Sequence, residues 1–277
     1  MRQTAIFYAG RSFTVKNNIF TARTYILGAA GLGLLVAALR ALCLALAFEG
    51  SYFTGSALPT VYRIVFLLAL STLSLFPALA LRGKIALARA PLTPAAKGGA
   101  ALAAIFAFAC FIAACTISNA SLPALLWLMG LLALLLTVIY FILQAVGAKA
   151  GDNAHAILGS ATIFALACLV AFTYFDVSTP MNAPHKLELH VALLGAVLYL
   201  LYELRARVGI SKPMALVTFS GLALFLTLSV SVSDIIGTVV GVFRDPLYLV
   251  QDLLLLALTV YIGARAFADA TKTTSKG

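Results

Sequence analysis

Charged residues are scarce in this sequence. Only 10% of its 277 residues are Asp, Glu, Lys or Arg, whereas 63% are hydrophobic. A soluble domain of this length needs a polar surface, with roughly 25% of its residues charged, so a soluble fold is excluded. Apolar runs of about 20 residues, the length needed to cross a bilayer, recur along the whole chain. We therefore expect an all-α integral membrane protein, with the lipid bilayer as its main partner.

Acidic residues are scarcer than basic ones. The chain has 9 Asp and Glu against 19 Lys and Arg, which gives a formal net charge of +10. In a soluble protein such an excess suggests nucleic-acid binding. Here most of the basic residues lie between apolar runs, and the chain has no nucleic-acid-binding motif. We therefore expect no nucleic-acid partner, and we interpret the charge as a signal of orientation in the membrane.

Sequence motifs of catalytic and metal sites are also missing. The chain contains no HExxH, no GxSxG and no phosphate-binding GxxxxGK[ST]. Its four cysteines form no CxxC pair and fall in apolar runs, where cysteine packs as a small hydrophobic residue. The histidines lie near the ends of apolar runs and no lysine lies mid-run, which argues against haem and retinal. We expect no catalytic residue, no metal site and no cofactor, and the balance is against an enzyme.

Eight apolar runs are what the chain does have. They cover residues 24–48, 58–81, 98–118, 122–146, 153–175, 187–208, 213–234 and 246–267. We expect a bundle of eight transmembrane helices that forms one domain over residues 24–267, followed by a cytoplasmic tail at 268–277. Residues 1–23 interleave aromatic with basic side chains, which fits either a segment held at the membrane surface or a disordered tail.

The basic residues gather in alternate loops. They lie before the first run and after the second, fourth, sixth and eighth runs, and the opposite loops hold very few. Because cytoplasmic loops carry an excess of Lys and Arg, both termini are expected in the cytoplasm. A prokaryotic plasma membrane is the expected location. The apolar segment Ile235–Phe243 then lies outside, either as a cover over a cavity or as an extension of the seventh helix.

The run at 187–208 has two contrasting faces. Residues three or four apart share one face of a helix, and the face with Glu188, Gly195 and Tyr199 is small or polar. The opposite face carries Leu189 and Leu193. Small residues allow close helix packing and polar groups avoid hydrocarbon. The first face is therefore expected to contact protein and the second to contact lipid.

Two further expectations concern position in the bundle. Lys186 and His190 lie roughly opposite Glu188, so we expect both to reach the lipid headgroups. The runs at 98–118 and 122–146 have few polar residues, so both are expected at the periphery of the bundle.

Two arginines and three acids occupy the outer halves of their predicted helices. Arg40 is expected about 12 Å, Arg63 about 7 Å and Asp252 about 9 Å inside the membrane boundary, at 1.5 Å per residue. An unpaired Arg at the centre of a helix costs between about 3 and 17 kcal/mol. We therefore predict that Arg40 pairs with Asp252, or otherwise with Glu188 or Asp234. The predicted ligand-binding residues of a polar, outward-facing cavity are Arg40, Arg63, Glu188, Tyr199, Asp234, Gln251 and Asp252.

Three functions are compatible with these features. The leading hypothesis is a transporter or membrane sensor that binds a small polar or amphipathic ligand in the outer cavity. A sensor would need a partner subunit in the membrane or cytoplasm, since the chain has no soluble output domain. The alternatives are a non-catalytic membrane subunit or scaffold whose buried ion pairs are structural, and a lipid-active enzyme inside the membrane.

Overall fold

The computed structural model describes residues 21–81, 90–116, 123–148, 152–177, 179–210, 212–243 and 245–273. Eight long helices account for most of them. They are α1 (Ala22–Leu46), α2 (Ala57–Ala80), α3 (Pro94–Thr116), α4 (Ala124–Val146), α5 (Asp152–Phe175), α6 (Pro184–Arg207), α7 (Pro213–Val239) and α8 (Pro246–Thr273). A short hairpin of β1 (Phe48–Glu49) and β2 (Tyr52–Phe53) follows α1. All eight helices are long and apolar enough to cross a membrane.

The eight expected spans are thus confirmed, with ends that proline and glycine set. Helices α3, α6, α7 and α8 begin with proline, which lacks an N–H group and suits the first helical position. Helix α4 ends at Gly147, whose φ of 72° is a left-handed conformation that favours glycine. Helix α7 continues to Val239, so most of the apolar segment at 235–243 extends that helix. The expected surface segment at 1–23 lies almost wholly outside the described residues.

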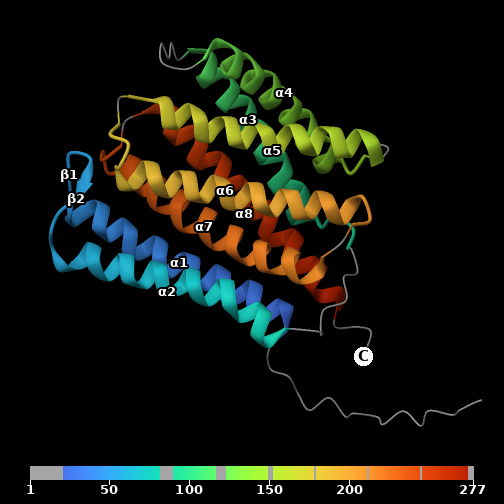
Figure 1. Cartoon of the computed structure of the whole chain (residues 1–277), viewed down its shortest axis with the longest axis horizontal. Helices are drawn as coiled ribbons and strands as arrows, with labels where there is room; N and C mark the ends of the chain where they lie inside the picture. Colours follow the sequence, from blue (N-terminus) through green and yellow to red (C-terminus); the bar gives the residue numbers. More distant parts are fainter. Residues whose placement is uncertain are drawn as a thin grey trace, which may run out of the picture.

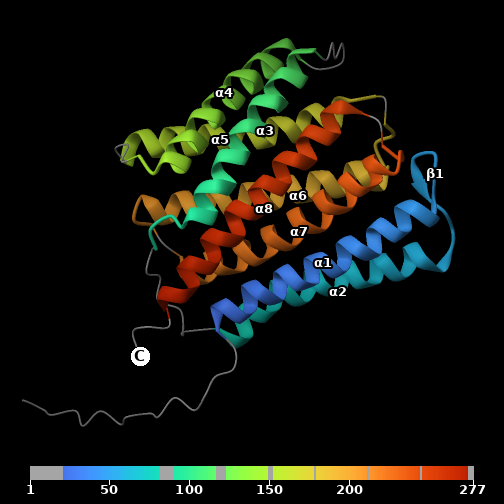
Figure 2. The ribbon, with the colours of Figure 1, turned by 180° about the vertical axis from the view of Figure 1, so that it is seen from behind.

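Six of the helices form a closed ring. Each helix from α3 to α8 packs on the next in sequence, and α8 packs back on α3. The α1–α2 pair lies against this ring on α7 (Figure 1). Seen from behind, α8 crosses beside α3 (Figure 2). Helices α7 and α8 are the most deeply buried spans and α2 is the least.

The sequence predicted that α3 lies at the periphery of the bundle. This prediction is wrong, because α3 packs on both α4 and α8. Its buried face consists of small residues: Ala96, Gly99, Ala100, Ala103, Ala104 and Ala107. A Cβ atom on Gly99 would lie 2.6 Å from the backbone nitrogen of Tyr261 in α8. Small side chains bring the two helix backbones into close approach. A lack of polar residues marked α3 as lipid-facing, whereas its small residues are what bury it.

Helix α6 is turned differently from the sequence expectation. Gly195 does face protein, because a Cβ atom there would lie 2.9 Å from Leu226 of α7. However, Leu189 and Leu193 are also fully buried, so the prediction that they face lipid is wrong. Helix α6 packs on both α5 and α7, and both faces are thereby covered. Its exposed stripe is Leu187, Val191, Leu194, Leu198 and Leu201.

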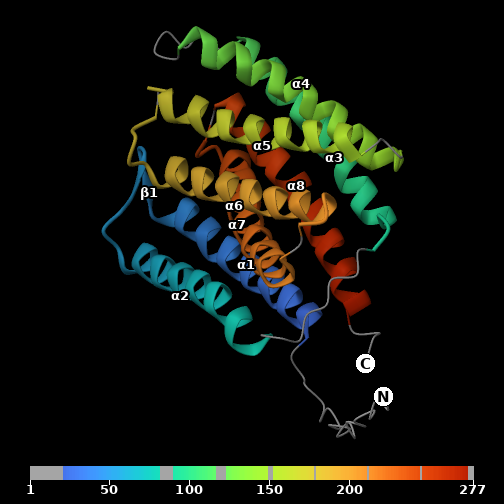
Figure 3. The same ribbon diagram turned by 45° about the vertical axis from the view of Figure 1, so that its right-hand side comes forward.

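The two ends of the bundle differ in their connections. The β1–β2 hairpin (48–53), the segment 179–183 and the α7–α8 connection (240–243 and 245) meet at one end, which we name the hairpin end. Helix α1 begins and α8 ends at the other, which we name the termini end (Figure 3). Large apolar side chains, mainly Leu, Ile and Val, are exposed along the sides of the helices between the two ends. That exposure suits a lipid environment.

Candidate functional site

Arg40 of α1 is the centre of a buried polar cluster. Its side chain is fully buried, because Arg40 lies on the side of α1 that packs against α7. The guanidinium donates hydrogen bonds to Glu188 of α6 and to Ser233 and Asp234 of α7. Both carboxylates are within ion-pair distance. One cation thus links three helices.

Two further side chains extend this cluster. The Tyr62 hydroxyl of α2 donates a hydrogen bond of 2.7 Å to Glu188. The Nδ1 atom of His185 lies 3.1 Å from the second carboxylate oxygen of Asp234. We name these six residues, Arg40, Tyr62, His185, Glu188, Ser233 and Asp234, the Arg40 cluster. It draws on four helices, and its outermost member, His185, lies one residue from the start of α6.

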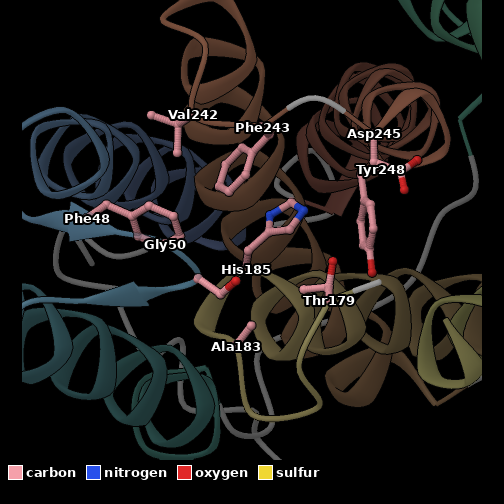
Figure 4. Close-up of a pocket in the computed structure, with 10 residues that line it drawn as sticks. Phe48, Gly50, Thr179, Ala183, His185, Val242, Phe243, Asp245 and Tyr248 are labelled. Atoms are coloured by element: carbon pink, nitrogen blue, oxygen red, sulfur yellow. The ribbon is translucent and has the colours of Figure 1, made fainter. Parts of the chain in front are cut away.

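A pocket of about 210 Å³ lies beside His185 at the hairpin end. Its walls come from the hairpin, the segment before α6 and the α7–α8 connection: Phe48, Gly50, Ser51, Thr179, Ala183, His185, Val242, Phe243, Asp245 and Tyr248. Figure 4 shows the imidazole among these residues, beside Phe243. The two rings stack with centroids 4.1 Å apart, and Tyr248 lies 4.8 Å from the imidazole. His185 therefore belongs to both the pocket and the Arg40 cluster.

The segment before α6 is held by a buried lysine. Lys186 is fully buried, and its ammonium donates to the backbone carbonyls of Asp176 at 2.6 Å and Thr179 at 3.2 Å. The expectation that Lys186 reaches the headgroups is wrong, because these carbonyls satisfy the charge inside the protein. His190 also turns inward, with its Nε2 atom 2.6 Å from the Thr173 hydroxyl of α5.

The first-named partner for Arg40 is wrong. Arg40 pairs with Glu188 and Asp234, and neither its hydrogen bonds nor its ion pairs in the described residues include Asp252. Asp252 is nevertheless buried in α8, close enough to interact electrostatically with Arg40 and Asp234. Within the described ranges, one of its carboxylate oxygens has no hydrogen-bond partner, and the same holds for both amide atoms of its neighbour Gln251. These two predicted site residues lie beside the cluster rather than in it.

The other two predicted residues lie elsewhere. Arg63 is on the exposed side of α2, and the hydrogen bonds that define the Arg40 cluster do not include it in the described residues. Tyr199 is fully buried but lies one turn from Glu203, towards the termini end. Of the seven predicted ligand-binding residues, the structure therefore brings together Arg40, Glu188 and Asp234, with Gln251 and Asp252 nearby. Whether they bind a ligand stays a prediction.

A second polar cluster near the termini end was not predicted. Glu203 accepts hydrogen bonds from Tyr261 at 3.0 Å and from Arg207 at 3.4 Å. Arg207 also donates to Gln144 at 2.6 Å. Arg265 lies 3.9 Å from Glu203 and donates to the Ala90 carbonyl at 2.7 Å. Opposite charges four residues apart, at 203 and 207 and at 265 and 269, were the sequence signal for it.

His185 and Tyr62 were also missed as members of the Arg40 cluster. Pro180 and Pro184 come just before His185 and favour a loop at this position, and a tyrosine in an apolar run gives no signal of its own. The described residues contain no group of three or more His, Cys, Asp or Glu side chains that could hold a metal ion. The described chemistry of this site is therefore hydrogen bonding and ion pairing by one guanidinium, two carboxylates and one imidazole.

The chain was compared with known proteins in three ways. No model of a known protein family matches it, and neither a curated protein nor a solved structure shows a significant match.

Proposed function

We propose that this multi-pass membrane protein binds a small amphipathic ligand in the pocket at the hairpin end, as a transporter or a membrane sensor. One observation carries the proposal. His185 lines the pocket with its ring and, through Nδ1, contacts Asp234, which is bonded to Arg40. A ligand that moves the imidazole would therefore act directly on the ion pairs that join α1, α6 and α7.

The pocket walls indicate the class of ligand. Phe48, Phe243 and Tyr248 supply aromatic surface, which suits an apolar portion of the ligand. Thr179 and Asp245 supply hydroxyl and carboxylate groups that can fix its orientation. The volume of about 210 Å³ limits the ligand to the size of an amino acid, a small amine or a short-chain acid.

The expected orientation gives this pocket its access. If the hairpin end faces outside, as the basic loops predict, the ligand enters from outside the cell, in the expected prokaryotic plasma membrane. A transporter must also open towards the termini end, where the second polar cluster, around Glu203, lies. A sensor keeps that end closed and passes the signal to a partner subunit.

Thermal unfolding of the purified protein tests ligand binding. Cys115 is exposed and is replaced by serine for this assay, whereas the thiols of Cys43, Cys110 and Cys168 are buried, so a thiol-reactive dye then reports unfolding. We expect at least one member of a panel of amino acids, small amines, short-chain carboxylates and monosaccharides to raise the melting temperature, because a ligand of the folded state stabilises it. Uptake of that compound into proteoliposomes then separates a transporter from a sensor.

A matched pair of variants locates the binding. Val242 lines the pocket, whereas Val240 is exposed two residues away and is not among the lining residues. Val242→Trp should fill the pocket and abolish the ligand-induced shift, and Val240→Trp should keep it. The proposal fails if no compound in the panel stabilises the protein, or if Val242→Trp binds as well as Val240→Trp.

The scaffold alternative rests on a separate observation. Arg40 already has partners on two other helices, which is what a purely structural ion pair requires. In that case the panel gives no shift and the cluster only holds the helices together. The fold and the Arg40 cluster are the same under both hypotheses, so the ligand experiment decides between them.

A further inference from the structure

Two carboxylates face each other across the α7–α8 contact. The Thr259 hydroxyl of α8 donates a hydrogen bond of 2.8 Å to the Thr227 hydroxyl of α7, which marks the facing sides of the two antiparallel helices. Seven residues make about two turns, so residues seven apart return to nearly the same face. Asp234 lies seven residues after Thr227, and Asp252 lies seven residues before Thr259. The two acids therefore lie on facing sides of the helices and at the same level.

The charges around this pair do not balance. Arg40 is the cation of the site, and it is bonded to both Asp234 and Glu188. The other titratable groups of the described site are His185 of α6, which contacts Asp234, Tyr62 of α2, which contacts Glu188, and the Cys110 thiol of α3, which interacts electrostatically with Asp252. None of these carries a fixed positive charge. If Asp252 were ionised, three carboxylates would share one guanidinium inside the bundle, and an unpaired buried charge costs several kcal/mol.

Several buried polar atoms of α7 and α8 have no hydrogen-bond partner among the described residues. In the part of the chain that the structure describes, these are the Oδ1 atom of Asp252, both amide atoms of Gln251 and the Ser231 hydroxyl. Asp252 is 1% exposed, and Gln251 and Ser231 are fully buried. A protonated carboxyl both donates and accepts a hydrogen bond, whereas an ionised one only accepts. Protonation thus removes the excess charge, and it lets Asp252 both donate and accept beside α7 and α8 groups that include free donors and free acceptors.

We propose that Asp252 is a proton-binding site inside the bundle, held neutral opposite Asp234 because Arg40 is already paired with two other acids. This site is a separate property from the ligand pocket, and it does not depend on the proposed function. It lies six residues below the start of α8, at a depth of about 9 Å.

Infrared spectroscopy of the purified protein in nanodiscs at neutral pH, without ligand, tests the site. We expect a carbonyl band of a protonated carboxylic acid, which an ionised carboxylate does not show. Asp252→Asn should abolish this band. Glu188→Gln should keep it, because Glu188 is an ionised partner of Arg40. A wild-type protein without the band, or an Asp252→Asn variant that keeps it, would overturn the proposal.

Thermal stability gives a second, independent measurement. Asparagine has the shape of a neutral aspartic acid, so Asp252→Asn should melt at the wild-type temperature or above it. Asp234→Asn is the matched variant, and it should melt at a lower temperature because it removes a charged partner of Arg40. If Asp252→Asn lowers the melting temperature, or prevents folding, as much as Asp234→Asn does, then Asp252 is a charged partner and the proposal is wrong.

Discussion

At the scale of single residues, Arg40 shows how one buried charge selects its surroundings. Its guanidinium has five N–H donors in a fixed plane, so it can serve acceptors on two helices at once. Glu188 accepts from Nε, Asp234 and Ser233 accept from Nη1, and Nη2 is buried without a hydrogen-bond partner among the described residues. A lysine at this position has one charged atom on a flexible stem and would not reach both acids with the same geometry.

Arg40→Ala should destabilise the protein strongly. Without the guanidinium, the buried Asp234 and the half-buried Glu188 lose their cation, and removal of one partner from a buried ion pair costs about 3–5 kcal/mol. We expect a large drop in melting temperature, measured by thiol labelling on heating. Arg40→Ala combined with Asp234→Asn should recover part of the loss, because it removes one of the stranded charges. Arg40→Ala with wild-type stability would contradict this account.

Lys186→Met should loosen the segment from Asp176 to Ala183. The ammonium of Lys186 binds two backbone carbonyls of this segment, and hydrogen bonds to a charged group contribute about 1.5–3 kcal/mol each. The variant should therefore be cleaved faster by protease between these residues. Leu187→Met is the control, since Leu187 is exposed on the next position of α6. Equal cleavage rates for the two variants would show that Lys186 does not hold the segment.

The sequence predicted that Arg40 is paired but not with which acid. The cost of a lone charge in hydrocarbon requires a partner, and Glu188, Asp234 and Asp252 all lay at suitable depths. Depth does not determine direction around the helix axis. Helix α1 packs mainly on α7, so Arg40 meets Asp234, and Asp252 on α8 lies further round. Only the order of helix packing separates the three candidates, and no residue pattern encodes that order directly.

At the scale of helices, small residues decide which spans meet. Two adjacent glycines in α3 illustrate this. A Cβ atom on Gly99 would contact the α8 backbone, whereas one on Gly98 would have nothing within 4 Å. Burial on α3 follows the small side chains and not the polar ones. The scarcity of polar residues therefore predicted a peripheral position for α3, whereas the stripe of small side chains would have predicted a buried one.

Gly99→Ala should destabilise the bundle, and Gly98→Ala should not. The added methyl group at position 99 would lie 2.6 Å from a backbone atom that cannot move without shifting α8. Overpacking of this kind typically costs about 1–3 kcal/mol. At position 98 alanine only improves helix propensity, a gain of up to about 1 kcal/mol. Melting temperatures of the two variants provide the measurement. A Gly99→Ala variant as stable as Gly98→Ala would mean that α3 and α8 do not meet closely at this point.

At the scale of the whole molecule, an even number of spans places both described chain ends at the termini end. The number of spans could be predicted from length and hydropathy alone, because a helix must be about 20 apolar residues long to cross the bilayer. The closed ring from α3 to α8 was not predictable in the same way. It depends on which faces of eight similar apolar helices fit together, and those faces differ by single methyl groups rather than by charge.

Orientation in the membrane is the last prediction. Loops at the termini end carry most of the basic residues, so that end should be cytoplasmic. In a variant without native cysteines, Gly55→Cys marks the hairpin end and Pro91→Cys the termini end, and both positions are exposed. A membrane-impermeant maleimide added to intact cells should label Gly55→Cys. It should label Pro91→Cys only after the membrane is permeabilised.

Ala148→Cys provides an independent check on the same side as Pro91, because Ala148 is exposed just after the end of α4. It should behave as Pro91→Cys does. Labelling of both termini-end positions from outside would mean that the protein has the opposite orientation in the membrane. The pocket beside His185 would then face the cytoplasm. Labelling of only one of them from outside would contradict the eight-span topology itself, because the two positions lie at the same end of the bundle. Labelling from outside therefore tests two predictions separately: the orientation inferred from the basic loops, and the number of membrane spans.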